Sequence, residues 1–167
     1  MSDTLIFEQN WEELRAALAK RGVIFNILIP FVFLGAGYTL RRMGVFSENT
    51  ILDESTHQLL LYILGALALG ELVIAYFLKR SLLSPERLGT AQMTFAEFSA
   101  RCVAGMTIVF MVGAAPAMYG FVVYALGATI EQFVFFVLVS LVGYRFLRPG
   151  KDELERLWNT AAGEIIQ

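Results

Sequence analysis

Residues 57–78, HQLLLYILGALALGELVIAYFL, decide the fold class of this chain. The run is almost wholly apolar, and about 20 helical residues at ~1.5 Å each cross the ~30 Å hydrocarbon core of a bilayer. Glu71 is the only acidic residue in it. Because an ionised side chain at the centre of a lipid-facing helix costs about 2.5–3.5 kcal/mol, we expect Glu71 to face another helix. The run therefore predicts a membrane-spanning helix with a protein partner.

The composition of the whole chain supports a membrane protein. Hydrophobic residues make up 57% of its 167 positions and charged residues 17%, against about 45–50% and 25% in soluble domains. The net charge of −2 argues against nucleic acid as a partner, because binding phosphates needs a basic surface. One cysteine and one histidine exclude an intrachain disulfide and a multi-His or Cys-based metal site in one chain. We expect no cofactor.

Four apolar runs predict an all-α integral membrane protein with a single four-helix transmembrane domain over residues 22–148. The expected spans are listed here in chain order: 22–40, 57–78, 101–126 and 130–147. Between the second and third we expect a cytoplasmic connector at 79–100, and after the fourth a cytoplasmic tail at 149–167.

Residues 1–21 predict an amphipathic helix lying on the membrane surface. Phe7, Trp11, Leu14 and Leu18 recur at a spacing that places them on one helical face. A helix packed on a soluble partner is the alternative reading of the same pattern.

Local signals mark the expected helix starts. Capping boxes pair a hydroxyl with a Glu or Gln three residues later, and three such pairs precede the apolar segments. These pairs are Ser55 with Gln58, Thr94 with Glu97, and Thr129 with Gln132. Gly127 suits a left-handed helix end, so the last two spans should form a tight antiparallel hairpin.

The basic residues predict the orientation of the spans. Of 13 lysines and arginines, only Arg41 and Arg42 fall between the first two spans, and the other 11 fall on the opposite side. The positive-inside rule then places both termini and the 79–100 connector in the cytoplasm. We expect a multi-pass protein of the bacterial inner membrane.

Small residues at helical spacing predict close packing between helices. Gly113, Ala117 and Gly120 share one face of the third span, and Ala66 and Gly70 repeat the pattern in the second. In lipid such residues let two backbones approach closely. We expect them to pack spans two and three together, or to join neighbouring protomers; a ligand channel along the same seam is the alternative.

The stretch APAMYGFV at 115–122 is followed by a short glycine turn and an aromatic-aliphatic helix that ends in Arg-Pro at 148–149. Over residues 100–149 this resembles the proteolipid c subunits of rotary ATPases, and more closely the small four-helix bacterial membrane proteins with a c-subunit-like hairpin. In that family a carboxylate just before the small-Pro-small-aromatic-Gly run binds the transported proton or sodium. The matching residues here, 113–115, are Gly, Ala and Ala, and none can titrate.

Glu71 is the candidate replacement for that missing carboxylate. If spans two and three are antiparallel, Glu71 lies within ~5 Å in depth of Ala114, so the resemblance implies a possible proton or ion site there. The alternative is a protonated Glu71 that is hydrogen-bonded across helices, with Tyr119, Thr107 and Tyr62 as candidate partners.

No nucleophile–base pair, phosphate loop or metal-ligand spacing occurs in the sequence, so we do not expect an enzyme. The favoured function is a non-catalytic integral membrane subunit, either a structural or accessory component of a larger complex or a homo-oligomer. Its partners would be the lipid bilayer and other integral membrane subunits or copies of itself. The competing function is a proton- or ion-coupled, c-subunit-like assembly that uses Glu71.

Overall fold

The computed structural model describes residues 3–46, 52–88 and 93–161, and all regular elements in these ranges are helical. In chain order they are α1 (Asp3–Val23), a π-helical turn η1 (Ile24–Leu28), α2 (Ile29–Arg42), α3 (Glu54–Leu82), α4 (Pro85–Leu88), α5 (Phe95–Ala125), α6 (Ile130–Leu147) and α7 (Lys151–Ala161). Four stretches are long and apolar enough to span a membrane: Leu5–Arg42, α3, α5 and α6. The expected all-α fold with four spans is confirmed, and the chain is a multi-pass membrane protein.

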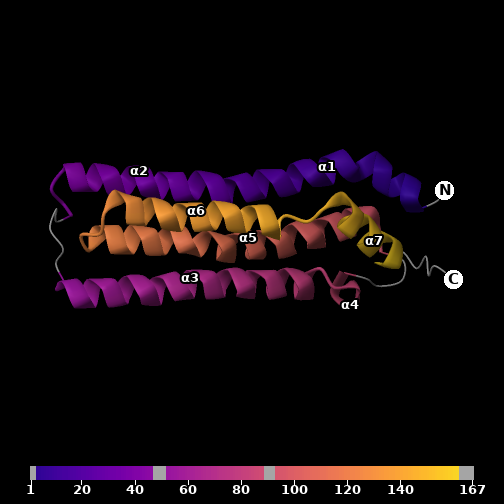
Figure 1. Cartoon of the computed structure of the whole chain (residues 1–167). Coiled ribbons are helices and arrows are strands. Elements are labelled where there is room, and N and C mark those ends of the chain that lie inside the picture. The colour runs from indigo at the N-terminus through magenta and orange to yellow at the C-terminus, as the bar shows by residue number, and fades with distance from the viewer. Residues whose placement is uncertain (1–2, 47–51, 89–92, 162–167) are drawn as a thin grey trace.

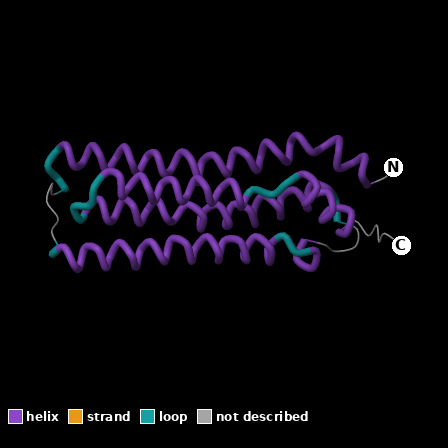
Figure 2. The backbone as a smooth tube through the Cα atoms, viewed as in Figure 1, coloured by secondary structure: helices purple, strands orange, loops and turns teal. Residues whose placement is uncertain are grey.

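The helices run lengthwise beside one another, with α5 and α6 between the α1–α2 rod and α3 (Figure 1). Of the most apolar 18 residues of each span, 50% are buried inside the chain in α5 but only 11% in α3. Within the described ranges, only short loops separate consecutive helices (Figure 2). The start of α1 lies at the same end of the bundle as α4 and α7 (Figure 1); we call this the terminal end and the other the loop end.

The α5–α6 hairpin forms as its local signals predict. Gly127 has φ of 100°, and the backbone N–H of Ala128 donates back to the carbonyl of Val123 at 3.0 Å, which closes the end of α5. Thr129 and Gln132 form the expected capping box at the start of α6. The two helices then pack closely, because Gly120 presents no side chain to α6.

The N-cap of α5 is the one that the sequence predicts, whereas the N-cap of α3 is a different residue. The capping box of Thr94 and Glu97 is confirmed at the start of α5. The box expected from Ser55 and Gln58 is wrong, because Asp53 is the N-cap of α3 and accepts from the Thr56 backbone N–H at 3.0 Å. The Ser55 hydroxyl also donates to the Asp53 carboxylate. These hydrogen bonds lower the pKa of Asp53 from 3.8 to about 2.

The N-terminal segment departs from the expected separate surface helix over 1–21. Helix α1 continues through η1 into α2 as one rod (Figure 1). Phe7, Leu14 and Leu18 are at most 4% exposed, so the apolar face expected to lie on lipid is covered by this chain's own α5 and α7. Three of the four residues expected on one face are thus buried together, but against protein.

The segments at the terminal end pack together into one hydrophobic cluster, which we call the terminal cap. The terminal cap comprises residues 5–18, α4, residues 95–102 and α7, and the cluster continues into the spans as far as Met106 and Phe110 of α5. Its largest buried side chains include Phe7, Phe98, Leu88, Leu154 and Trp158. The expected interfacial connector at 79–100 and tail at 149–167 are therefore, where described, packed elements. About 20 residues cannot bury a core alone, but these separate segments do so jointly.

Aromatic rings and one partly buried ion pair hold α7 in the terminal cap. The Trp158 ring lies edge-on to Phe95 and Phe98, each at a centroid distance of 5.3 Å. The Lys79 ammonium, on α3, lies 2.8 Å from the Glu153 carboxylate on α7. Because Lys79 is only 9% exposed, leaving it without a carboxylate would be strongly destabilising.

At the loop end, Arg41 ties the rod to the α5–α6 turn. Its guanidinium donates to the Ala128 carbonyl at 2.7 Å and lies 4.5 Å from the centroid of the Tyr124 ring. These two contacts give Arg41 a structural role at the loop end, where basic residues are few. Its charge is stabilised by a carbonyl just beyond the end of α5 and by the face of an aromatic ring.

Replacing Gly120 by alanine should weaken the α5–α6 hairpin. The added Cβ would lie 2.6 Å from the Phe133 ring and 2.8 Å from the Phe136 Cβ, and such overpacking costs about 1–3 kcal/mol. Unfolding in detergent by added dodecyl sulfate measures the loss. The matched control is Gly35→Ala inside α2, where nothing lies within 4 Å; it should leave stability unchanged or raise it by up to about 1 kcal/mol, because alanine is the better helix former. Equal effects of the two substitutions would contradict the packing assigned to Gly120.

Candidate functional site

Glu71 faces the seam between α3 and α5, where it meets Tyr119. The Tyr119 hydroxyl donates to Glu71 Oε1, while Oε2 is buried and has no hydrogen-bond partner. Of the three partners considered, Tyr119 is confirmed. Thr107 instead donates to the Val103 carbonyl at 2.7 Å, and Tyr62 is 75% exposed. Glu71 therefore contacts another helix, as its place in an apolar run predicted.

The spacing of small residues on α3 positions this carboxyl. Ala68 and Ala75 are 1% and 0% exposed, and they share one helical face with Glu71 at steps of three and four residues. Their short side chains let α5 approach α3, so the Glu71 side chain reaches the seam. The residue of α5 that the carboxyl contacts is Tyr119, not Ala114, the position that matches the carboxylate of the c subunits. Tyr119 is five residues beyond Ala114, or ~7.5 Å along the helix.

The small residues of the third span are buried, but they face different neighbours from those expected. Ala117 is fully buried, and a Cβ at Gly120 would meet α6 side chains. A Cβ at Gly113 would lie 2.7 Å from Leu147 of α6 and 3.2 Å from Asn26 Oδ1 of η1. This face of α5 thus packs on α6 and on the rod rather than on α3.

Ala66 and Gly70 lie on the outer face of α3. Both are exposed, and a Cβ at Gly70 would have no other atom within 4 Å. They therefore do not contact the third span. The small residues of α3 that pack against α5 are Ala68 and Ala75. Their spacing of seven residues on the face of Glu71 is the sequence signal that would have identified them. Ala66 also lines a mainly apolar groove of about 620 Å³ between α3 and α6, together with Gly65, Leu69 and Phe135.

Two buried polar side chains, Asn26 and Ser140, lie on either side of Gly113, where the rod, α5 and α6 meet. The Ser140 hydroxyl donates to the Gly113 carbonyl at 3.0 Å, and the Asn26 amide donates to the Gly22 carbonyl at 3.5 Å. Both side chains are fully buried. Asn26 lies in η1, and its Oδ1 has no hydrogen-bond partner. The sequence signal is a polar residue inside an apolar run, which usually bonds across helices.

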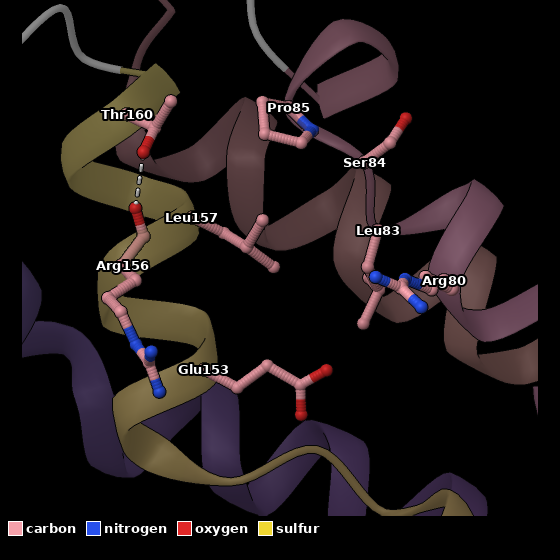
Figure 3. Close-up of a pocket in the computed structure, with 8 residues that line it drawn as sticks. All are labelled: Arg80, Leu83, Ser84, Pro85, Glu153, Arg156, Leu157 and Thr160. Atoms are coloured by element: carbon pink, nitrogen blue, oxygen red, sulfur yellow. Dashed lines mark hydrogen bonds between the residues drawn. The ribbon is translucent and has the colours of Figure 1, made fainter.

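At the terminal end, a cavity of about 460 Å³ lies between α7 and the segment that joins α3 to α4. Arg80 and Arg156 line it together with Glu153, Leu83 and Leu157 (Figure 3). Glu153 extends from α7 into the space between the helices (Figure 3) and is paired with Lys79. The cavity thus carries both signs of charge.

No group of three or more His, Cys, Asp or Glu side chains in the described ranges is placed to hold a metal ion. Comparisons with known protein families, with curated proteins and with solved structures find no match to the chain. The fold and its polar contacts define a multi-pass, four-helix membrane protein with a carboxyl–phenol pair between two of its spans.

We predict a measurable coupling energy between Glu71 and Tyr119. A double-mutant cycle of Glu71→Leu and Tyr119→Phe should give about 0.5–1.5 kcal/mol, because hydrogen bonds between membrane helices fall in that range. Stability is measured by dodecyl sulfate unfolding in mixed micelles. The control cycle pairs Glu71→Leu with Tyr62→Phe, whose exposed ring should show no coupling. A Glu71–Tyr119 coupling no larger than that of the control would contradict the assigned hydrogen bond.

Proposed function

We propose that the chain is a non-catalytic integral subunit of the bacterial inner membrane, with both termini in the cytoplasm. It assembles through the outer face of α3 with other integral membrane subunits or with copies of itself. The observation that carries this proposal is the exposure of Ala66 and Gly70 on a span that the rest of the chain barely covers.

Small residues favour the association of helices in lipid. Apolar side chains gain nothing by leaving lipid for another apolar surface, so close backbone approach at small residues is what favours helix association. Ala66 and Gly70 lie on one line of α3 with Val73, and the groove between α3 and α6 continues beside them. A helix from another subunit could approach the α3 backbone here, as α6 approaches α5 at Gly120.

The proposed orientation rests on the distribution of basic residues. Arg80, Arg145, Arg148 and Lys151 all lie at the terminal end of the bundle, whereas Arg41 lies near the α5–α6 turn at the loop end. The positive-inside rule therefore favours a cytoplasmic terminal cap. A folded cap on that side offers a rigid surface to the partners of an accessory subunit.

Assembly is tested by Gly70→Leu, which places a large side chain on the proposed contact. The tagged wild-type chain, purified from its native membrane in mild detergent, should run well above the 18.6 kDa protomer, whereas Gly70→Leu should release the monomer. Native mass and the identities of co-purifying proteins distinguish a homo-oligomer from an accessory subunit.

The matched control is Val32→Phe, which adds bulk at an exposed site on α2, separated from α3 by α5 and α6. It should leave the assembly intact. A wild-type chain that is monomeric and co-purifies with nothing in a fixed ratio would contradict the proposal, as would full assembly of Gly70→Leu.

The unpaired Oε2 of Glu71 supports a second candidate, the proton- or ion-coupled assembly with c-subunit-like character. A carboxyl that accepts from Tyr119 on one oxygen can hold a proton or contact a small cation with the other. Glu71→Gln distinguishes the two functions. The structural proposal predicts unchanged assembly and, in proteoliposomes, no Glu71-dependent proton or sodium flux. A flux in the wild type that is lost in Glu71→Gln would establish the second candidate.

A further inference from the structure

A third cavity, of about 370 Å³, lies where α1 passes the end of α6 and the start of α7. It differs from the others in its charge. Four of its lining residues are basic, namely Arg15, Arg145, Arg148 and Lys151. The rest of the wall is uncharged and consists of Trp11, Leu18, Pro149 and Gly150. No carboxylate lines it.

Two of the four cations are already compensated. The Arg15 guanidinium lies 3.2 Å from Glu12, and the Lys151 ammonium lies 2.6 Å from Glu8. That contact with Glu8 raises the pKa of Lys151.

Arg145 and Arg148 are exposed, and neither forms an ion pair within the described part of the chain. They lie at the C-terminal end of α6, whose dipole supplies only about half a negative charge. The cavity therefore keeps an excess of positive charge that nothing within it neutralises.

The depth of the cavity matches that of lipid headgroups. Helix α6 has 18 residues, or ~27 Å, which is close to the ~30 Å of the hydrocarbon core. Its last turn and C-cap, which carry Arg145 and Arg148, thus reach the membrane surface. Trp11 lies in the same wall and stacks on Phe7 at a centroid distance of 5.6 Å. Tryptophan is enriched at this level of membrane proteins.

We propose that this cavity binds the phosphate group of an anionic membrane phospholipid. Guanidinium groups bind phosphate oxygens through paired, charge-assisted hydrogen bonds, and Arg145 and Arg148 supply two such groups. The acyl chains would lie along the exposed face of α6, where Phe146 and Val142 are 76% and 53% exposed. Lipids of this charge bind basic pockets between spans on the cytoplasmic side.

The cavity between α7 and the end of α3 provides the matched control. It also has two arginines, Arg80 and Arg156, but Glu153 extends between the helices there (Figure 3). Glu153 is paired with Lys79, but its carboxylate still lines this cavity and opposes a phosphate there, so the same double substitution should affect lipid binding far less. Both cavities lie at the terminal end, so each double variant removes two positive charges from the same side of the protein. Any effect of charge on membrane orientation is therefore the same in both variants.

The experiment is native mass spectrometry of the purified full chain titrated with phosphatidylglycerol or phosphatidylcholine of the same acyl chains. One phosphatidylglycerol should bind in preference to phosphatidylcholine. Each basic residue near an anionic surface contributes about fivefold, so Arg145→Gln with Arg148→Gln should weaken phosphatidylglycerol binding on the order of 30-fold. Phosphatidylcholine binding should not change. Arg80→Gln with Arg156→Gln should change neither by more than about twofold.

A second variant keeps the test valid if the glutamine variant misfolds. Arg145→Lys with Arg148→Lys retains both charges but loses the planar fork, and it should retain the lipid preference with a smaller, several-fold loss. Equal wild-type affinity for the two lipids, or equal losses in the two double glutamine variants, would overturn the proposal. Displacement of phosphatidylglycerol by millimolar inorganic phosphate would overturn the lipid source and make free phosphate the ligand.

Discussion

The length of α5 is the constraint on which the rest of the structure depends. At 31 residues it exceeds the ~20 needed to cross the hydrocarbon core, and it is the most buried of the four spans. Its later part lets α6 approach at Gly120. Its first turns carry Phe95 and Phe98, which need protein around them once they lie beyond the lipid. The terminal cap provides this protein cover, because α1, α4 and α7 all pack on the first turns of α5 or on one another.

Local sequence signals predicted the features that depend on few neighbours. The number of spans follows from hydrophobic length, and the boundaries of the last span, 130–147, agree with α6. The α5–α6 turn follows from Gly127 and Thr129, whose backbone preferences act within a few residues. The partnering of Glu71 follows from the free energy of leaving a carboxylate in lipid. The identity of that partner, Tyr119, comes from the structure alone.

The features that the sequence did not reveal depend on distant segments. Lys79 and Glu153 are 74 residues apart, and nothing in either local pattern indicates the other. An apolar stripe on residues 1–21 has the same appearance whether it meets lipid or protein, so the cover over Phe7 and Leu14 could not be predicted. Likewise, Ala66 and Gly70 share their spacing pattern with residues that pack internally, but helix rotation turns them outward and places Ala68 at the seam.

The central claim is that the segments beyond the bilayer fold into a cap around the first turns of α5. Amide hydrogen exchange of α7, residues 151–161, tests it most directly in the full chain reconstituted in lipid. We expect slow exchange of the α7 amides from Leu154 to Trp158, and a large increase on Trp158→Ala, because the Trp158 ring packs on Phe95 and Phe98. Complete exchange of α7 within seconds in the wild type would contradict the cap and make this segment an unpacked tail.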